Sequence, residues 1–421
     1  MKVVTIGLGY IGLPTSLMFA RHGAEVVGVD ISKRVVGFLN AGHVLIEEPG
    51  LEAYLTEALL QQKFKASLIP EEGDVFIIAV PTPNLSDKYG SCDLTYVKKA
   101  IESILPYLKK GNTVIIESTI APCTTEDIIQ PLIEKVGFQI GEDIFLVHCP
   151  ERVLPGKILH ELVNNNRIIG GVTEKCTQKG IEIYGLFVKG KSLGASASAA
   201  ELAKLMENTY RDVNIALANE LVLISEKLGI DALSVIQLAN EHPRVDIHQP
   251  GPGVGGHCLA VDPYFIIAKA PERAQLIHQA RKINSQMPGF IVNQVQEIME
   301  ENKGTKVTVL GLTYKGNVDD IRESPSLQII NELERSTSYQ IVIFDPYVAE
   351  VGTSSIEEAL VNSDLALVLT DHDEFKEISE KQIRNMKTPI LFDTKNCVKT
   401  LNQFEKEYSL GRLPSVKQLE M

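Results

Sequence analysis

The sequence lacks the features that mark several broad classes of protein. Its six cysteines form no CxxC pair, which argues against a disulfide framework and indicates a reduced, intracellular protein. The net charge is −13, so the chain has no overall basic footprint of the kind that nucleic-acid-binding proteins carry. No hydrophobic run approaches the ~20 residues of a membrane span. We therefore expect a cytoplasmic protein that binds neither nucleic acid nor membrane.

The apolar beginning of the chain also lacks the marks of a signal peptide. Glycines and Pro14 interrupt it, and no small-residue cleavage site follows, so we interpret residues 2–6 as a buried strand. The 421 residues, 44% of them hydrophobic, are enough for two or three domains with real cores.

The pattern of apolar runs divides the chain into three blocks. In residues 1–197 and again in 304–421, β-branched runs alternate with amphipathic stretches, which is typical of βαβ units and a doubly wound parallel sheet. Residues 198–303 are helical. We predict an α/β protein in which two Rossmann-like domains are joined by a central all-helical dimerisation domain.

The boundaries of the main elements follow from the same pattern. Two long helices are expected at Ala199–Leu228, ending at Gly229, and at Glu272–Glu301, with a kink at Pro288 and Gly289. The strands are expected at Lys2–Ile6, Glu25–Asp30, Asp74–Val80, Thr113–Glu117, Ile144–His148, Arg167–Gly170, Lys306–Leu310, Gln340–Phe344, Leu365–Leu369 and Pro389–Phe392.

A dinucleotide-binding fingerprint, GxGxxG, follows the first predicted strand and opens a helix. The first glycine allows a tight turn, the second lets a pyrophosphate approach the helix N-terminus, and the third lets helix and strand pack closely. Asp30 would accept hydrogen bonds from a ribose, which favours NAD over NADP, although Arg34 lies near enough to meet a 2′-phosphate. The alternative is a structural glycine turn. The loop residues are Gly7, Gly9, Tyr10, Ile11 and Gly12.

Polar residues follow three further predicted strands, where a doubly wound sheet binds its ligands. Thr82 and Thr119 are candidates to contact the cofactor or a water molecule, although each is equally a plain strand-end cap. The segment 149–157 carries Glu151 and Arg152 in what we expect to be an exposed loop that contacts substrate. A solvated surface loop is the alternative.

Lys204 and Asn208 lie one helical turn apart in the first long helix. The neighbours of Lys204 are apolar, and a partly buried ammonium requires an anionic partner. Such a pair suits an oxyanion that develops during a reaction, with Arg211 near the same face. A solvated helix face is the alternative.

A glycine-rich loop, 251–262, presents Cys258 and then Asp262. Glycines let a bulky ligand come close, and a thiol presented in this way is a candidate nucleophile. Asp262 would position a proton or a water molecule. Two alternatives are a metal site formed with His257, for which no second ligand pair exists, and a buried structural thiol. We expect no metal.

These motifs together resemble the UDP-glucose/GDP-mannose dehydrogenase family, and they occur in the family's order. The resemblance implies an N-terminal NAD domain, a helical dimerisation core and a C-terminal UDP-binding domain. It also implies an NAD-dependent, four-electron oxidation of a sugar C6 alcohol to a carboxylate. The motifs are GxGxxG, Pro81-Thr82-Pro83, Glu117-Ser118-Thr119, the Lys204/Asn208 helix, Gly255-Gly256-His257-Cys258 with Asp262, and Gly311-Leu312-Thr313-Tyr314-Lys315.

The resemblance implies a role for each candidate catalytic residue. Cys258 would add to the C6 aldehyde, and the thiohemiacetal would become a thioester that water hydrolyses. Lys204 and Asn208 would hold the C6 oxygen. Asp262 and Thr119 would hold or activate the water, with Glu151 as the other candidate base. Contacts with cofactor or substrate are implied for Arg322 (cofactor) and for Arg244, lent to a neighbouring subunit, Gly255 and Lys315 (substrate).

The resemblance extends to the sugar. Residues 150–157, 208–220 and 250–258 resemble the branch that acts on UDP-N-acetyl-D-mannosamine, with UDP-N-acetylglucosamine as the alternative. UDP-glucose is disfavoured because that branch tends to have Tyr, where this chain has His257. Arg152 or Arg211 is a candidate reader of the 2-acetamido group. A two-electron β-hydroxyacid dehydrogenase and a catalytically silent nucleotide-sugar-binding protein are the alternatives from other classes.

Overall fold

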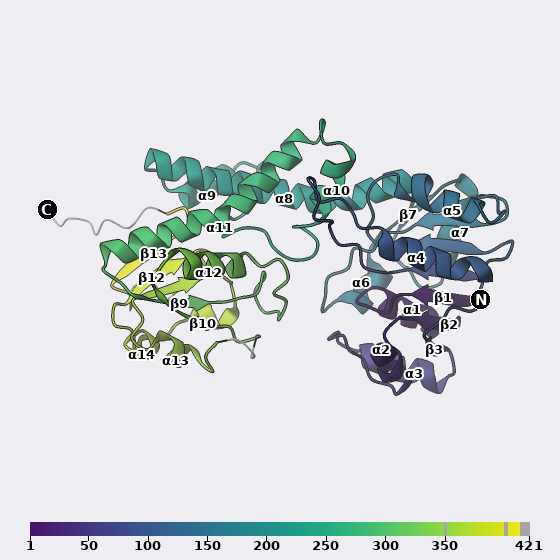
Figure 1. Ribbon diagram of the computed structural model, residues 1–421, viewed down its shortest axis with the longest axis horizontal. Coiled ribbons are helices and arrows are strands. Elements are labelled where there is room, and N and C mark those ends of the chain that lie inside the picture. The colour runs from purple at the N-terminus through teal and green to yellow at the C-terminus, as the bar shows by residue number, and fades with distance from the viewer. Residues whose placement is uncertain (349–351, 400–402, 413–421) are drawn as a thin grey trace. The chain divides into compact units, whose positions relative to one another are not determined.

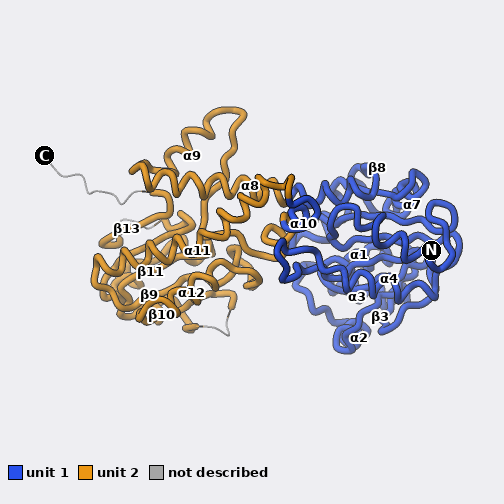
Figure 2. The backbone as a smooth tube through the Cα atoms, turned by 45° about the horizontal axis from the view of Figure 1, so that its top comes forward, with its two compact units in different colours: residues 1–207, 264–271 blue, residues 208–263, 272–421 orange. Residues whose placement is uncertain are grey.

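The computed structural model describes residues 1–348, 352–399 and 403–412, which form two compact units (Figures 1 and 2). Unit 1 contains residues 1–207 and 264–271, and unit 2 contains residues 208–263 and 272–421. The division falls inside one long helix, α8 (Ala197–Leu228).

Unit 1 is built on an eight-stranded sheet with the order β3-β2-β1-β4-β5-β6-β7-β8. The strands are β1 (Lys2–Ile6), β2 (Glu25–Val29), β3 (Phe64–Ser67), β4 (Val75–Ile78), β5 (Thr113–Ile116), β6 (Phe145–His148), β7 (Arg167–Gly171) and β8 (Ser192–Ser196). The helices are α1 (Gly12–Arg21), α2 (Lys33–Asn40), α3 (Leu51–Leu60), α4 (Thr95–Ile104), α5 (Gln130–Glu134), α6 (Ile158–Asn164), α7 (Glu174–Tyr184) and most of α10 (Asp262–Lys269), whose first two residues belong to unit 2. Short helical turns lie at Leu105–Tyr107 and Thr125–Ile129.

The central strands of this sheet are buried on both faces. Strands β4 and β5 are short apolar runs in which every residue is buried, as expected when helices cover both sides of a parallel sheet. Neighbouring strands in the sheet pair in parallel except β6 and β7, which are antiparallel. This reversal places the last residues of β7, Gly170 and Gly171, opposite the end of β6, so Arg167, the first residue of β7, lies beyond that end.

Unit 2 contains a five-stranded parallel sheet with the order β10-β9-β11-β12-β13. Its strands are β9 (Lys306–Leu310), β10 (Gln340–Phe344), β11 (Leu365–Val368), β12 (Ile390–Asp393) and β13 (Lys406–Ser409). Besides most of α8, its helices are α9 (Ala232–Asn240), α11 (Gln275–Glu301), α12 (Pro325–Ser336), α13 (Ile356–Leu360) and α14 (Glu380–Ile383), with a short turn at Asp373–Lys376.

Alternate residues of the unit 2 strands enter two different cores. In β11, Leu365 and Leu367 join one cluster with residues of α11 and α12, whereas Ala366 and Val368 join another with residues of α13 and Phe375. The side-chain period of two therefore separates the two faces of the sheet. Figure 1 shows α11 and α12 on one side of this sheet and α13 and α14 on the other.

A ladder of polar side chains joins α8 to α11 inside unit 2. Asp212 accepts hydrogen bonds from Arg281 (2.6 Å) and from Asn284 (2.8 Å), and all three side chains are buried. Asn284 in turn accepts from Asn219, whose own amide oxygen accepts from the backbone N–H of Gly251. Because buried polar groups need partners, this ladder aligns the two helices and anchors the start of the glycine-rich loop.

The expected fold class is confirmed, and so are the two long helices, which occupy 197–228 and 275–301. Gly229 follows α8 with φ +67°, the left-handed conformation of a helix C-cap, and α11 continues through Pro288. The strands β3, β8 and β13 were not expected. Each is an edge strand with few apolar residues, so none produces the continuous run by which buried strands are recognised.

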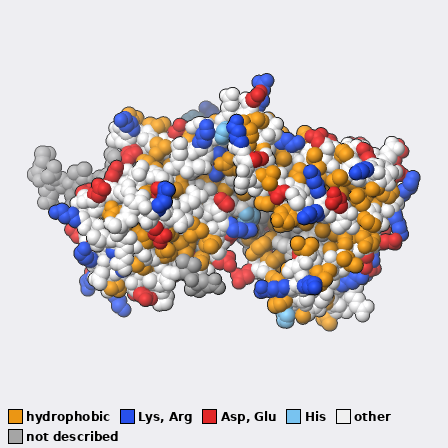
Figure 3. All heavy atoms as spheres, in the orientation of Figure 1, with side chains coloured by type: hydrophobic (Ala, Val, Ile, Leu, Met, Phe, Trp, Pro, Cys, Tyr) orange, Lys and Arg blue, Asp and Glu red, His pale blue; other side chains and the backbone are white. Residues whose placement is uncertain are grey.

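The surface carries charges of both signs. On the face drawn in Figure 3, Lys and Arg side chains are interspersed with Asp and Glu, so that no patch of one sign dominates it. Within the described ranges, every helix is too short or too polar to span a lipid bilayer.

Candidate active site

The glycines of the fingerprint have different geometries. Gly7 has φ +95°, and a Cβ there would lie 2.4 Å from the carbonyl oxygen of Ala79. A Cβ on Gly12 would lie 1.9 Å from the carbonyl oxygen of Gly7. A Cβ on Gly9 would meet no protein atom within 4 Å. Gly7 and Gly12 are therefore required by the protein's own packing, whereas Gly9 leaves open space beside the start of α1. Tyr10 is exposed, and Ile11 immediately precedes α1.

The fingerprint lies where the strand order reverses, between β1 and β4, which is the ligand-binding position of a doubly wound sheet. Asp30, after β2, accepts hydrogen bonds from the backbone N–H groups of Leu8 (3.2 Å) and Ser32 (2.9 Å), so its carboxylate is fixed beside the fingerprint. Arg34 is exposed and lies over the ring of Phe38. This open loop, helix terminus and carboxylate fit the pyrophosphate and ribose of a dinucleotide.

The carboxyl ends of β4 and β5 reach the same edge of the unit 1 sheet as the fingerprint. The Ser118 hydroxyl joins them, because it accepts from the N–H of Val80 (2.9 Å) and donates to the Val80 carbonyl (2.8 Å). Thr82 and Thr119, one or two residues beyond this link, are half-buried. Ser118 is thus a structural clamp that sets the positions of Thr82 and Thr119.

The segment after β6 was expected to be an exposed loop, and for its first residues this is wrong. Cys149 is fully buried, and the side chain of Glu151 is 8% exposed. The reason is Arg167 at the start of β7, whose guanidinium lies 2.7 Å from Glu151 and 2.9 Å from Glu117. Burial raises the pKa of Glu117 to about 7, while the positive charge of Arg167 opposes this rise.

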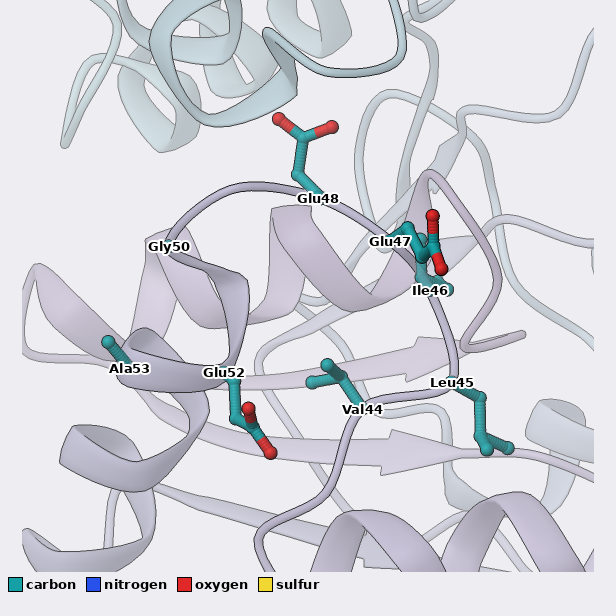
Figure 4. A pocket seen from close by; sticks show the side chains of 8 residues that line it. All are labelled: Val44, Leu45, Ile46, Glu47, Glu48, Gly50, Glu52 and Ala53. Carbon is teal, nitrogen blue, oxygen red and sulfur yellow. The ribbon is translucent and has the colours of Figure 1, made fainter. Parts of the chain in front are cut away.

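The later residues of this segment are held by Glu48. Its carboxylate accepts from the backbone N–H groups of Gly156 (2.7 Å) and Ile158 (2.8 Å), the residue at which α6 begins. Glu48 belongs to the connection between α2 and α3, beside a hollow of about 630 Å³. In Figure 4 the Glu48 side chain points away from Glu52, which lies at the other end of this hollow. The guanidinium of Arg152 donates hydrogen bonds to Glu207 (2.7 Å) and to the carbonyl of Asn166.

Lys204 is buried in the part of α8 that belongs to unit 1. His148, at the end of β6, is also buried, and burial together with the positive charge of Lys204 lowers the pKa of His148 to about 3. The imidazole is therefore neutral at physiological pH and adds no positive charge near Lys204.

The loop that carries Cys258 packs tightly within unit 2. A Cβ on Gly255 would lie 2.4 Å from the carbonyl oxygen of Glu323, and Gly256 donates its N–H to the carbonyl of Arg322 (3.0 Å). Cys258 itself is partly exposed. Burial, with the negative charges of Asp320 and Cys258, raises the pKa of Tyr314. The glycines thus bring the thiol against the segment 314–325.

Asn208 connects two other candidate residues of unit 2. Its amide nitrogen donates to Asp262 (2.5 Å), and its amide oxygen accepts from Arg211. The carbonyl of Cys258 accepts from the N–H of Asp262 (2.9 Å), which starts α10. Arg211 therefore sets the direction in which Asn208 presents its N–H groups, toward Asp262.

Three other predicted contact residues lie in loops of unit 2. Arg322 makes a forked hydrogen bond to Asp320 (2.9 and 2.6 Å), and its guanidinium lies 3.0 Å from Nδ1 of His257. It thus lies next to the residue that precedes Cys258. Lys315 and Arg244 are exposed.

The predicted residues are divided between the two units. The set of unit 1 comprises Gly7, Gly9, Tyr10, Ile11, Gly12, Asp30, Arg34, Thr82, Thr119, Glu151, Arg152 and Lys204, and that of unit 2 comprises Asn208, Arg211, Arg244, Gly255, Cys258, Asp262, Lys315 and Arg322. All six cysteines lie within the described residues, and none of them is in a disulfide bond. Among the described residues, no cluster of three or more His, Cys, Asp or Glu side chains is arranged to hold a metal ion.

Sequence reasoning missed several residues that position this chemistry, chiefly Glu48, Glu117, Arg167 and Asn219. Arg167 had one available signal, since a charged residue at the start of an apolar strand requires a buried partner. The partners of Glu48 are backbone groups far away in the sequence, and those of Asn219 are the distant backbone N–H of Gly251 and the side chain of Asn284. No sequence pattern exists for such partners.

Comparison with known proteins identifies relatives over nearly the whole chain. Residues 1–188, 198–286 and 308–400 match, in that order, the NAD binding, central and UDP binding domains of the UDP-glucose/GDP-mannose dehydrogenase family. A UDP-N-acetyl-D-mannosamine dehydrogenase of Methanococcus vannielii is 47% identical over 94% of this chain and 93% of its own.

Solved structures agree with this match. The UDP-N-acetyl-mannosamine dehydrogenase Cap5O from Staphylococcus aureus has a TM-score of 0.93 and 55% identity, over 98% of this chain and 99% of that one. The corresponding enzyme from Pyrococcus horikoshii has a TM-score of 0.91 and 42% identity, over 98% and 99%.

The contrast between Gly9 and Gly12 predicts two different defects. Gly12→Ala should lower the free energy of unfolding by about 1–3 kcal/mol, because its Cβ overlaps the backbone of Gly7. Gly9→Ala should fold as the wild type does but bind NAD about tenfold or more weakly, because its methyl group enters the space left for the pyrophosphate. Urea denaturation and NAD titration measure the two effects. Equal NAD affinity in Gly9→Ala and the wild type would contradict this assignment.

Proposed function

Because the chain belongs to the UDP-glucose/GDP-mannose dehydrogenase family, we propose that it oxidises C6 of UDP-N-acetyl-D-mannosamine to the carboxylate of UDP-N-acetyl-D-mannosaminuronate. The family consists of NAD-dependent dehydrogenases, and the chain is such an oxidoreductase. The choice of sugar is supported by the relatives from Methanococcus vannielii, Staphylococcus aureus and Pyrococcus horikoshii, which share this substrate in name. UDP-N-acetylglucosamine is the alternative substrate.

The observation that carries the proposal is the loop of Cys258. A partly exposed thiol follows Gly255 and Gly256, where a larger side chain would clash with the segment 314–325. Asn208 and Asp262 are bonded to each other, and Asp262 is also bonded to the carbonyl of Cys258. A two-electron dehydrogenase has no use for this arrangement, whereas oxidation beyond the aldehyde requires a nucleophile.

NAD, when bound, accepts the hydride in both oxidations. Gly7, Gly9 and Gly12 would hold its pyrophosphate at the start of α1, and Asp30 its ribose. Thr82 and Thr119 would contact it from the ends of β4 and β5. Asp30 would repel a 2′-phosphate, so we propose NAD rather than NADP as the cofactor, even though Arg34 is nearby. Arg322 is the proposed cofactor contact from unit 2.

The residues of the chain perform the remaining chemistry. The Cys258 sulfur bonds to C6 of the aldehyde, and after the second oxidation this bond is a thioester, which water cleaves. Lys204 and Asn208 would stabilise the negative charge that develops on the C6 oxygen. Asp262 and Thr119 would hold the attacking water, and Glu151 is the other candidate base. Arg152, Arg211, Arg244, Gly255 and Lys315 would contact the nucleotide sugar.

Three broader assignments belong to the same proposal. The chain is divided into an NAD-binding domain (1–197), a helical dimerisation domain (198–303) and a UDP-sugar-binding domain (304–421). It works in the cytoplasm, where its scattered cysteines stay reduced. It forms a homodimer, for which α8 offers an apolar face: Tyr210, Leu217 and Ile224 recur every seven residues, and all three are exposed.

NADH production is the direct test. With UDP-N-acetyl-D-mannosamine we expect two NADH per sugar, and little from UDP-N-acetylglucosamine or UDP-glucose. Cys258→Ala should stop after the first oxidation and reduce carboxylate formation by about a thousandfold or more, because the nucleophile is lost. One NADH per sugar from the wild type would contradict the thioester route, and no NADH from any of the three sugars would contradict an enzymatic function.

The same three sugars test the candidate readers of the acetamido group. Arg152→Leu or Arg211→Leu should reduce the preference for acetamido sugars over UDP-glucose by about tenfold, the value of a lost charge-assisted hydrogen bond. The measurement is the ratio of kcat/KM values, with Lys189→Leu, an exposed cation elsewhere in unit 1, as the control. An unchanged ratio in both variants would exclude both arginines as readers.

The proposed dimer predicts that a charge on the apolar face of α8 halves the mass of the particle in solution. Leu217→Asp should convert the dimer to a monomer, because it places a charge at the centre of the apolar face of α8. Analytical ultracentrifugation measures this, and Leu276→Asp, at an exposed position of α11, is the matched control. A wild type that sediments as a monomer would refute the proposal.

A further inference from the structure

A buried cluster of charged side chains lies behind Glu151, and the mechanism proposed above uses only Glu151. The guanidinium of Arg167 lies 2.9 Å from Glu117 and 2.7 Å from Glu151. The side chains are 5% exposed for Arg167, 0% for Glu117 and 8% for Glu151. Two carboxylates thus face one cation in a space that is almost closed to bulk water.

The charges of this cluster do not balance unless it holds a proton. With both carboxylates ionised, the cluster would bury one net negative charge, which is costly in a medium of low dielectric constant. A single shared proton makes it neutral. The pKa of Glu117 agrees with this, because burial raises it to about 7, and the charge of Glu151 adds to the rise.

Every other polar group that faces Glu117 leaves room for this proton. The Tyr184 hydroxyl of α7 donates to Oε1 of Glu117 (2.5 Å), the same oxygen that Arg167 contacts, and Thr15 of α1 also lies beside this carboxyl. Cys149 accepts from Nε of Arg167 (3.1 Å). Among the described residues, Oε2 of Glu117 has no hydrogen-bond partner. A proton on Oε2 therefore breaks none of the bonds that Oε1 accepts.

Glu151 also borders a route to solvent. A polar hollow of about 280 Å³ lies beside it, large enough for several water molecules. One of its walls is Glu207, whose side chain is 46% exposed. The hollow is lined by Pro150, Glu151, Arg152, Glu161, Asn165, Asn166, Arg167 and Glu207.

We propose that Glu117 is the proton-holding partner of Glu151. Arg167 holds the two carboxylates together so that they share one proton, and protons that Glu151 takes from the substrate leave through the polar hollow. Glu117 does not touch the substrate and is a positioning residue. This inference rests on the proposed function, in which Glu151 is a candidate base.

The chemistry of the proposed reaction creates the need for such a pair. Oxidation of the alcohol sends a hydride to NAD and releases the hydroxyl proton, and oxidation of the thiohemiacetal does the same. Hydrolysis of the thioester returns the thiol and releases a third proton with the carboxylate. A base that must accept protons repeatedly works best when it titrates near the working pH and passes them on.

Two substitutions should move the pH profile of kcat in opposite directions. Glu117→Gln removes one negative charge from the pair, so the acid limb of the profile should shift by about one unit or more to lower pH. Tyr184→Phe keeps the ring that lies 4.1 Å from the guanidinium of Arg167 but removes the hydroxyl that stabilises ionised Glu117, so the limb should shift to higher pH. KM for both substrates should stay within about twofold of the wild type.

The controls separate this role from a merely structural one. Glu182→Gln, an exposed carboxylate on α7, removes the same charge outside the cluster and should leave the profile unchanged. A packing defect would lower stability, but it would not shift the acid limb to lower pH in Glu117→Gln and to higher pH in Tyr184→Phe. If Glu117→Gln does not fold, Tyr184→Phe still decides, and an acid limb that does not move in any folded variant would overturn the proposal.

A spectroscopic measurement distinguishes this proposal from the proposed function. The carbonyl stretch of a protonated carboxylic acid should be present in the infrared spectrum of the free enzyme at pH 6 and should titrate near pH 7. The band should be weaker in Glu117→Gln, where other buried acids such as Glu201, whose pKa burial also raises to about 7, still contribute to it. Glu117 keeps its proton to a higher pH in the folded protein than in the unfolded chain. As the pH rises from about 4.5 to 7, the free energy of unfolding of the wild type should therefore fall relative to that of Glu117→Gln. A band of equal strength in the wild type and in Glu117→Gln would overturn the shared proton even if the enzyme oxidises its sugar.

Discussion

The parallel pairing of strands is the constraint on which both units depend. Parallel strands deliver their carboxyl ends to one edge of a sheet, so residues distant in sequence meet there. In unit 1 this edge receives the fingerprint after β1, Asp30 after β2, and Thr82 and Thr119 after β4 and β5. In unit 2 the carboxylate of Asp345, after β10, accepts from the N–H of Leu312, after β9 (2.6 Å), and contacts His372, beyond β11 (3.1 Å).

The one reversal of strand direction in unit 1 has a chemical consequence. Because β7 is antiparallel to β6, with His148 opposite Gly170, its first residue lies at the carboxyl edge. That residue is Arg167. When the register is continued beyond the paired residues, Arg167 falls opposite Glu151. A parallel β7 would have carried Arg167 to the far edge of the sheet. The cation that joins Glu117 to Glu151 is therefore positioned by topology, not by proximity in the sequence.

Sequence reasoning predicts periodic elements and short motifs well, for physical reasons. Buried strands of a parallel sheet are apolar throughout, and the glycines of the fingerprint are needed by the fold itself, as Gly7 and Gly12 show. Edge strands such as β8 carry no such signal. Side chains that hold the loop of Cys258 and the segment after β6 bond to distant partners. Asn219 bonds to Gly251, 32 residues away, and Glu48 bonds to Ile158, 110 residues away. Contacts of this kind depend on tertiary structure, which local patterns do not encode.

Two buried charge clusters illustrate how structure separates stability from chemistry. In unit 2, Asp212 faces Arg281 alone and is further satisfied by Asn284, so its charges balance and the cluster aligns two helices. In unit 1 two carboxylates compete for Arg167, so the charges of this cluster do not balance. Such an imbalance costs stability, and apolar residues of similar size would relieve it. A protein retains such a charge imbalance where a proton has to be transferred, and the proposed oxidation requires proton transfer at Glu151.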